Sequence, residues 1–277
     1  MDDIYRFEPL DLSPEGCARI SGLLRTVFPK ARHLTPRYID WLYAQGPDGP
    51  AVGCNAFAGA QLVGHMAALP MIARAEGVET RVLFMVNGAV HPGHRGRRLQ
   101  SRISAAMFED GARLGYAFIL GTGNRYSTGP LLTRFRMVRP LEARLGFGRL
   151  RRREPSVEPS FERVWSDEAL RWRLANPEAR YAVTPGGIVA PAGAPGIGAI
   201  LHDRPGAVAA TAGGAPGPLR LYLGLDPNLD WGRSAFLPIP LALRPSPLNL
   251  VFRDLSGSSQ LPDPDRFVFR ALDFDPY

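Results

Sequence analysis

Lysine is almost absent from this chain of 277 residues, in which Lys30 is the only one. Lysine and arginine together number 33 against 26 acidic residues, which gives a formal net charge of +7. Such a charge suits nucleic acid, an anionic membrane or a phosphorylated ligand. Because nearly all of it is arginine in a chain also rich in alanine, glycine and proline, it resembles genomic base-composition bias. Only local clusters of arginine therefore carry weight as evidence for a partner.

Cysteine and long apolar runs are also scarce. Two cysteines, Cys17 and Cys54, exclude a disulfide framework and a cysteine-based metal site, and we expect no metal site elsewhere. Both are expected to be small buried residues. No stretch approaches the roughly 20 apolar residues of a membrane-spanning helix. The first residues, MDDIYRFEPL, are acidic where a signal peptide is basic, so we expect a cytoplasmic protein without a membrane span.

The length and a hydrophobic content of 45% predict two domains with ordinary cores. The segment RRREPSVEPS is charged, contains two prolines and has no apolar periodicity, as is typical of a linker. The sequence therefore predicts a first domain at 1–150, a linker at 151–160 and a second domain at 161–277.

Apolar periodicity predicts alternating strands and helices in the first half of the chain. The expected elements are a strand at 3–10, helices capped by Ser13 and Thr35, strands at 51–58, 61–73 and 80–91, a helix at 99–114 ended by Gly115, and a strand at 116–123. Asn87-Gly88 interrupts the strand at 80–91, and we interpret this pair as a bulge rather than a turn. Residues 125–150 are expected to form a short helix and one or two strands.

The second half contains a segment that resembles one in the first. Thr35 precedes Trp41 by six residues and Ser166 precedes Trp172 by the same interval, in both cases within a sequence typical of a capped helix. Chance could produce one such match, but both segments lead into a glycine-rich strand region, which favours an internal duplication. Further strands are expected within 184–201, 218–225, 247–255 and 265–275.

A cluster of positive charge lies between the strand at 80–91 and the helix at 99–114, where Arg95, Arg97 and Arg98 occur together. The amides that open a helix lack intrahelical acceptors, and the helix dipole favours negative charge, so this junction is a predicted anion site. Arginine adds charge-assisted hydrogen bonds to phosphate. The alternative is a solvated turn, which the position between a central strand and an amphipathic helix disfavours.

At this junction the sequence resembles the GNAT superfamily of acyl-CoA-dependent N-acyltransferases. The triplet Val90-His91-Pro92 precedes Arg95-Gly96-Arg97-Arg98-Leu99-Gln100, which falls at the family signature Arg/Gln-x-x-Gly-x-Gly/Ala. Arg98 and Gln100 replace the small residues of that signature. The resemblance covers roughly residues 1–150 and implies an α/β (α+β) fold with a mixed, mainly antiparallel sheet flanked by helices. A second, degenerate GNAT-like domain without the arginine loop is expected to follow.

The resemblance also implies a co-substrate, acetyl-CoA or another acyl-CoA. The backbone of Ala89, Val90 and His91 is expected to bind the pantetheine arm and to polarise the thioester carbonyl. Asn124 matches an asparagine that contacts the cofactor arm. The pyrophosphate is expected at the loop formed by His94, Arg95, Gly96, Arg97, Arg98, Leu99 and Gln100.

Attack of an amine on a thioester needs a base for the amine and an acid for the leaving thiolate. The family acid is a tyrosine near 130–132, where this chain has none, so Tyr126 is the candidate acid, with a packing or rim position as its alternative role. The family base is often a glutamate on the bulged strand, and none lies between Arg81 and His91. His65 is the candidate base and His91 a weaker one. A structural, hydrogen-bonded His65 with a water chain as base is the alternative.

These residues predict an N-acyltransferase that moves an acyl group, acetyl in the simplest case, to a primary amine of a small molecule or an amino sugar. The acceptor is expected between the two domains. The alternatives are an N-acyltransferase that depends on acyl carrier protein and a non-catalytic CoA-binding module of the same fold. Nucleic acid ranks last as a partner, because the arginines are scattered and are not interleaved with aromatic residues on one face.

Overall fold

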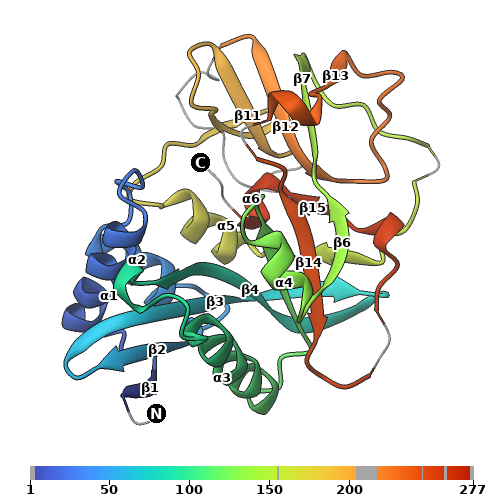
Figure 1. The fold of residues 1–277 in the computed structure, drawn as a ribbon. Helices are drawn as coiled ribbons and strands as arrows, with labels where there is room; N and C mark the ends of the chain where they lie inside the picture. The colour runs from blue at the N-terminus through green and yellow to red at the C-terminus, as the bar shows by residue number, and fades with distance from the viewer. Residues whose placement is uncertain (1–3, 155, 204–216, 245, 259–260, 275–277) are drawn as a thin grey trace.

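The computed structural model describes residues 4–154, 156–203, 217–244, 246–258 and 261–274. All fifteen strands of the described residues belong to two sheets, one of eight strands and one of seven, and helices flank them (Figure 1). Neighbouring strands are mostly antiparallel, with two parallel pairs. The expected mixed α/β fold with mainly antiparallel sheets is confirmed.

The first half folds into the elements that its sequence predicts. They are β1 (Tyr5–Pro9), α1 (Pro14–Val27), α2 (Pro36–Ala44), β2 (Val52–Ala58), β3 (Gln61–Ala75), β4 (Val78–Val90), the 3-10 turn η1 (Pro92–His94), α3 (Leu99–Arg113) and β5 (Phe118–Gly123). Ser13 Oγ accepts a hydrogen bond from Gly16 N at 3.1 Å, and Thr35 Oγ1 accepts one from Tyr38 N at 3.2 Å, so both are N-caps. Gly115 has φ +78° and ends α3 in the left-handed conformation.

Side chains along β3 alternate between two covered faces of the first sheet. Ala67 and Leu69 pack with α1 and α2, whereas Met66 and Ala68 pack with α3. Figure 1 accordingly shows α1 and α2 on one side of β3 and β4, and α3 on the other side. Because both faces are buried, β2 and β3 are apolar almost without interruption.

The remaining elements are shorter. Residues 125–150 form α4 (Thr128–Leu132), β6 (Arg136–Pro140) and β7 (Glu142–Phe147), as expected. They are followed by β8 (Phe161–Arg163), α5 (Asp167–Leu174), β9 (Ala182–Thr184), β10 (Gly187–Pro191), β11 (Ile197–His202), β12 (Leu219–Leu225), β13 (Phe236–Pro238), η2 (Leu241–Leu243), β14 (Asn249–Asp254), η3 (Pro264–Arg266), β15 (Phe269–Arg270) and α6 (Ala271–Phe274).

Each sheet takes strands from both halves of the chain. The first has the order β1-β2-β3-β4-β5-β14-β6 with β8 beside β3, and the second has the order β13-β7-β12-β11-β10-β9 with β15 beside β12. Thus β14 lies between β5 and β6, as Figure 1 shows for β14 and β6, while β7 lies between β12 and β13. The strand pairings therefore cross the segment 151–160 in both directions.

The segment predicted as a linker is attached to the second sheet. Arg152 forms ion pairs with Asp203 and Asp226 at 2.5 and 3.0 Å. It also forms an isolated β-bridge with Leu229. The prolines and charges of this segment indicate that it forms no regular helix or strand. They do not show whether its arginines form ion pairs with buried carboxylates elsewhere in the fold.

The strand expected at 265–275 is wrong over most of its length. Only Phe269 and Arg270 form a strand, paired with β12, and α6 begins at Ala271. Asp273 Oδ2 accepts a hydrogen bond from Arg270 N at 2.6 Å. This is the return bond of a capping box, and it favours a helix over an extended chain. Residue 275 lies outside the described residues.

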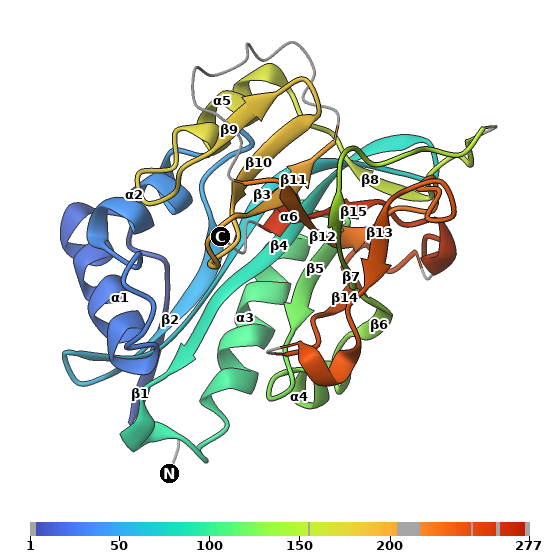
Figure 2. The ribbon, with the colours of Figure 1, turned by 90° about the horizontal axis from the view of Figure 1, so that it is seen from above.

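The two tryptophan segments that resemble each other in sequence meet in the structure. The indole Nε1 of Trp41 donates to the Trp172 carbonyl at 3.2 Å, and the Nε1 of Trp172 donates to the Trp41 carbonyl at 3.2 Å. Their rings stack with centroids 4.9 Å apart. Figure 2 shows α5 close to α2, seen from above. The contact is reciprocal, as expected of two copies of one segment packed about a local twofold axis.

The two cysteines are buried and unpaired, as predicted. Burial raises the pKa of the Cys54 thiol to about 11, which leaves it protonated near neutral pH. Among the described helices, none has both the length and the apolar character needed to cross a membrane. Within the same residues, no three His, Cys, Asp or Glu side chains are grouped to hold a metal ion.

Candidate functional site

β4 contains the bulge that its Asn-Gly pair predicts. His65 of β3 pairs with Ala89 and Ala67 pairs with Val86, so Asn87 and Gly88 together oppose one residue of β3. Asn87 has φ +54°, a left-handed conformation that asparagine tolerates better than most residues. A side chain at Gly88 would place its Cβ 2.7 Å from Met66 Cε. The bulge thus turns the end of β4 out of the regular ladder.

Close to the bulge, β4 separates from its parallel neighbour β5. The two strands pair only from Val82 to Phe84 on β4 and from Phe118 to Leu120 on β5. β4 then continues to Val90 and β5 to Gly123 without further pairing between them in the described chain. The carboxyl ends of the strands therefore diverge, and their backbone groups face a wedge in which a ligand can bind them.

The arginine loop joins β4 to α3. Gly96 and Arg98 have φ +76° and +57°, so Arg98 adopts the backbone conformation that favours the glycine of the family signature. Arg98 is the N-cap of α3, and no side chain caps this helix among the described residues. Arg102 N donates to Arg98 O, so the amides of Leu99, Gln100 and Ser101 precede the first helical hydrogen bond. Together with the helix dipole they provide the predicted anion site.

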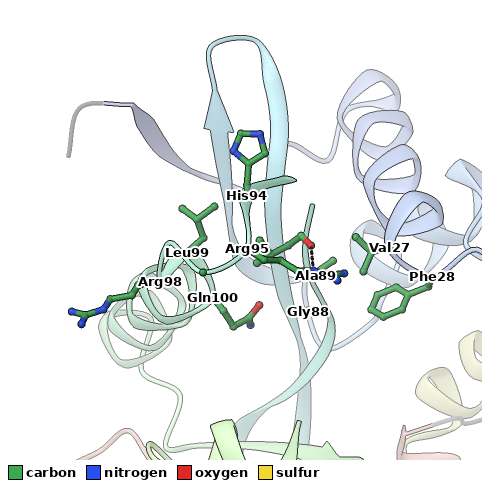
Figure 3. Close-up of a pocket in the computed structure, with 11 residues that line it drawn as sticks. Val27, Phe28, Gly88, Ala89, His94, Arg95, Arg98, Leu99 and Gln100 are labelled. Atoms are coloured by element: carbon green, nitrogen blue, oxygen red, sulfur yellow. Dashed lines mark hydrogen bonds between the residues drawn. The ribbon is translucent and has the colours of Figure 1, made fainter. Parts of the chain in front are cut away.

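A cavity of about 390 Å³ lies between this loop, the bulge and the end of α1, and we name it the loop cavity. It is lined by Val27, Phe28, Gly88, Ala89, Val90, His94, Arg95, Gly96, Arg98, Leu99 and Gln100. In Figure 3 the Arg98 side chain points away from Phe28 and Gly88. The side chain that replaces the signature glycine therefore does not fill the space between the loop and the bulge.

A larger cavity of about 800 Å³ occupies the wedge between β4 and β5, and we name it the splay cavity. It is lined by Phe28, Ala31, His33, Leu34, Met66, Met85, Val86, Asn87, Gly88, Gln100, Ser101, Ser104, Thr122, Asn124, Tyr126, Ser127, Pro130, Leu131, Arg134 and Phe135. Apolar side chains from both faces of the sheet and from α4 contribute much of this lining.

A third cavity of about 350 Å³ lies between α2, β4 and the elements α5 and α6 of the second half, and we name it the interdomain cavity. It is lined by His33, Tyr38, Leu42, Leu69, Phe84, Val86, Asn87, Arg173, Asn176, Glu178, Ala179, Asp273 and Phe274. Both signs of charge are present. Burial raises the pKa of Asp273, with Arg163 and Arg270 opposing that shift.

The three cavities meet at the bulge of β4. Gly88 lines the loop and splay cavities, and Asn87 lines the splay and interdomain cavities. A long molecule in the first two cavities can therefore meet a second molecule in the third beside Asn87.

The structure brings most of the predicted cofactor residues to the loop cavity, with His91 and Arg97 engaged elsewhere. His91 Nδ1 accepts a hydrogen bond from Gly93 N at 3.2 Å. Arg97 donates to the Tyr5 hydroxyl at 3.2 Å, and the same hydroxyl lies 3.0 Å from His94 Nδ1. β1 thus holds the loop through Tyr5.

Asn124 and Tyr126 line the splay cavity where β5 passes into α4. Asn124 Oδ1 accepts hydrogen bonds from the amides of Tyr126 and Ser127 at 2.9 and 3.0 Å, which forms the turn before α4. Tyr126 is 81% exposed. It therefore stands at the rim of the splay cavity, and its role as the acid stays a prediction.

His65 is fully buried, away from the lining of the three cavities. Its Nδ1 lies 2.7 Å from Asn55 Oδ1, and its Nε2 lies 3.0 Å from the Tyr43 hydroxyl. Burial lowers the pKa of His65 to about 3, so the ring is neutral near neutral pH. An amine bound in one of the cavities would therefore not contact this ring directly. His65 is a structural, hydrogen-bonded residue here, which is the alternative given to its role as the base.

Three residues at the site escaped the sequence analysis. Phe28 lines two cavities, Tyr5 holds the arginine loop, and Tyr43 accepts a hydrogen bond from Asn87 Nδ2 at 2.9 Å. Tyr5 is 89 residues from His94, and Tyr43 is 44 residues from Asn87. No local pattern reports contacts at such separations.

A bulged strand, a diverging parallel neighbour and a basic loop at the start of a helix are the parts of a donor site for acyl transfer. Comparison with family models agrees, because residues 12–135 match the model described as "Acetyltransferase (GNAT) domain". This match supports the GNAT superfamily for residues 12–135, the part of the chain that carries the bulge and the arginine loop. No curated protein sequence matches the chain.

Solved structures resemble the chain at low identity. A conserved protein of Enterococcus faecalis V583 of unknown function, described as a "Probable N-Acyltransferase", is 12% identical with a TM-score of 0.58, over 91% of this chain and 73% of that one. Eis1 from Mycobacterium abscessus is 12% identical with a TM-score of 0.47, over 68% and 53% of the two chains. The first likeness shows that the fold of nearly the whole chain recurs in another protein.

Proposed function

We propose that the protein transfers an acyl group from an acyl-CoA to a primary amine of a small molecule or an amino sugar. The donor binds in the loop and splay cavities and the acceptor in the interdomain cavity. The observation that supports this most is the meeting of the three cavities at the bulge of β4. Two substrates that react with each other need such a junction.

The residues present fit the donor. The uncapped amides of Leu99, Gln100 and Ser101 suit the pyrophosphate, and Arg95 and Arg98 add positive charge beside them. The unpaired edge of β4 suits the amide groups of the pantetheine arm, which can pair with it as an added strand does. Asn124 stands on the opposite wall of the wedge.

The reaction forms a carbon–nitrogen bond and breaks the carbon–sulfur bond of the thioester. Backbone N–H groups at the bulge would stabilise the negative charge that develops on the carbonyl oxygen. The amine nitrogen loses a proton and the leaving thiolate gains one. Because His65 is buried, we assign the first of these transfers to water in the interdomain cavity. Tyr126, at the rim of the splay cavity, is the candidate donor of the second proton.

The size of the splay cavity bears on the acyl group. Its volume of about 800 Å³ and its lining by Met66, Met85, Leu131 and Phe135 exceed what an acetyl group fills once the arm is bound. This favours acyl groups longer than acetyl. The basic loop would also suit an acidic acyl carrier protein, so turnover with acyl-CoA alone distinguishes the two donors.

Thermal unfolding with CoA, acetyl-CoA and longer acyl-CoAs at moderate salt tests donor binding. A ligand at a hundred times its dissociation constant stabilises the folded state by about 2.7 kcal/mol, which raises Tm by several degrees in a chain of this size. We expect Arg98→Glu to reduce this shift, because it places negative charge at the anion site. Arg113→Glu makes the same change at the other end of α3 and should leave the shift intact.

Release of the CoA thiol in the presence of glucosamine, spermidine, tyramine and kanamycin tests transfer. Faster release with one of these amines, and an acylated amine detected by mass spectrometry, would support the proposal. Binding of CoA without turnover of any amine would support the non-catalytic module instead. If no CoA shifts Tm, the proposed donor site is wrong.

A further inference from the structure

A chain of four polar side chains leads from the interior of the first sheet to the bulge. His65 lies between Asn55, 2.7 Å from its Nδ1, and the Tyr43 hydroxyl, 3.0 Å from its Nε2. Asn87 Nδ2 donates to the same hydroxyl at 2.9 Å. Asn55 is 2% exposed, and His65 and Tyr43 are fully buried. Burial of three polar side chains is unfavourable unless each is hydrogen-bonded. Removal of any one of them would therefore leave a neighbour buried without its hydrogen-bond partner.

The chemistry of the four groups fixes the direction of every bond. The Asn55 Oδ1 is an acceptor, so the neutral His65 ring carries its proton on Nδ1 and its Nε2 is an acceptor. The Tyr43 hydroxyl must then donate to Nε2 and accept from Asn87. Burial raises the pKa of Tyr43, so its proton stays in place. The donor side of the Asn87 amide is therefore bound to the protein interior.

This arrangement leaves the oxygen of the Asn87 side chain for the cavities. Within the described part of the chain, Asn87 Oδ1 accepts no hydrogen bond, and it is not among the buried atoms that lack a partner. Asn87 lines both the splay and the interdomain cavities. An acceptor oxygen with a fixed orientation thus lies where the two proposed substrates meet.

We propose that Asn87 Oδ1 accepts a hydrogen bond from the acceptor amine and directs the lone pair of that nitrogen toward the thioester. Tyr43, His65 and Asn55 are positioning residues that prevent the Asn87 amide from rotating. The inference rests on the proposed function and adds the residue that orients the nucleophile. Asn87 takes no proton in this role, because an amide oxygen is too weak a base. Orientation of a bound nucleophile is a known source of rate enhancement.

Two substitutions separate this role from donor binding. Asn87→Gly removes the side chain and keeps a residue that tolerates φ +54°. Tyr43→Phe keeps the side chain and frees the Asn87 amide. The matched control is Tyr222→Phe in β12, which removes a buried hydroxyl that has no hydrogen-bond partner in the described residues.

The measurements are the dissociation constant of CoA by calorimetry and kcat/KM for the amine that the wild type turns over fastest with its best acyl-CoA donor. We expect Asn87→Gly to lower kcat/KM for the amine by about tenfold or more, the size of one lost hydrogen bond in a fixed geometry. Tyr43→Phe should lower it in the same direction. The CoA dissociation constant should change by less than about threefold in both variants. Tyr222→Phe should match the wild type in both measurements.

Unchanged kcat/KM in Asn87→Gly would overturn the inference, and so would an equal loss of CoA affinity, since the bulge would then serve the donor alone. If Tyr43→Phe does not fold, Asn87→Gly decides the matter, because it leaves the buried trio in place. A wild type that binds no CoA or acylates no amine contradicts the proposed function itself. That result is distinct from the failure of one variant.

Discussion

At the scale of single residues, Arg98 explains how a changed signature can keep its loop. It adopts φ +57°, the conformation available at little strain only to glycine and, to a lesser extent, asparagine. Its side chain points away from the space between loop and bulge in Figure 3. The loop thus holds an arginine in a left-handed conformation that glycine adopts more easily, which leaves some strain in it.

Replacing Arg98 by glycine should therefore preserve or raise stability. A residue of L chirality in this conformation is strained by roughly 1 kcal/mol, part of which the larger unfolded-state entropy of glycine cancels. Arg95, in the same loop, has φ −67°, so Arg95→Gly should destabilise by about 0.5–1 kcal/mol. Urea unfolding compares the two variants. An Arg98→Gly protein as unstable as Arg95→Gly would show that the left-handed conformation is not strained.

His65 should make the fold sensitive to acid. Its pKa of about 3 in the folded state lies below the value near 6.5 of an unfolded histidine. Between these pH values the unfolded state binds a proton that the folded state does not, so stability falls as the pH falls. This group alone contributes a slope of up to ~1.4 kcal/mol per pH unit. Urea unfolding at pH 7, 6 and 5 gives the free energy of unfolding as a function of pH. This free energy should fall less steeply with falling pH in His65→Gln than in the wild type, and an equal dependence on pH would contradict the buried, neutral ring.

At the scale of elements, the Trp41 and Trp172 pair joins α2 to α5. Each indole both stacks on the other and donates to the other segment, so each substitution removes part of the same contact. A double-mutant cycle of Trp41→Phe and Trp172→Phe should therefore show a coupling energy of about 1 kcal/mol or more. Trp41→Phe combined with Trp231→Phe, which lies in a different cluster, should be additive. Additive effects in the first cycle would mean that the pair does not couple the two helices.

The elements also show what the sequence can predict. Helix caps at Ser13 and Thr35, the bulge at Asn87 and the loop before α3 depend on neighbouring residues, and all of them were predicted. Helix α6 was not predicted, because the alternation of apolar residues over 265–275 indicated a strand. That pattern outweighed the capping hydrogen bond from Arg270 N to Asp273, three residues along the chain. The hydrogen-bonded series of side chains that runs from Asn55 through His65 and Tyr43 to Asn87 was not predicted. Its members lie on β2, β3, α2 and β4, and only the fold brings these elements together.

At the scale of the whole molecule, strand exchange makes the two sheets dependent on each other. β14 completes the first sheet between β5 and β6, and β7 completes the second between β12 and β13. Neither half of the chain can unfold without removing a strand from the sheet that the other half mainly builds. Calorimetry of the intact chain should therefore give one transition, with calorimetric and van't Hoff enthalpies close to each other. Two separate transitions would contradict this dependence.

The whole arrangement also explains why the acyl donor and the amine are assigned to different cavities. The first half of the chain provides the loop and the wedge, and the second half provides α5 and α6 on the far side of Asn87. Asn87 of the bulge, together with His33 and Val86, lines both the splay cavity of the donor and the interdomain cavity of the amine.

A crystal structure of the protein with bound CoA tests this account most directly. We predict the pyrophosphate at the amides of Leu99, Gln100 and Ser101, the arm along the free edge of β4, and the thiol beside Gly88 and Asn87. CoA bound at another surface, or an arm that does not reach the bulge, would contradict the proposed donor site.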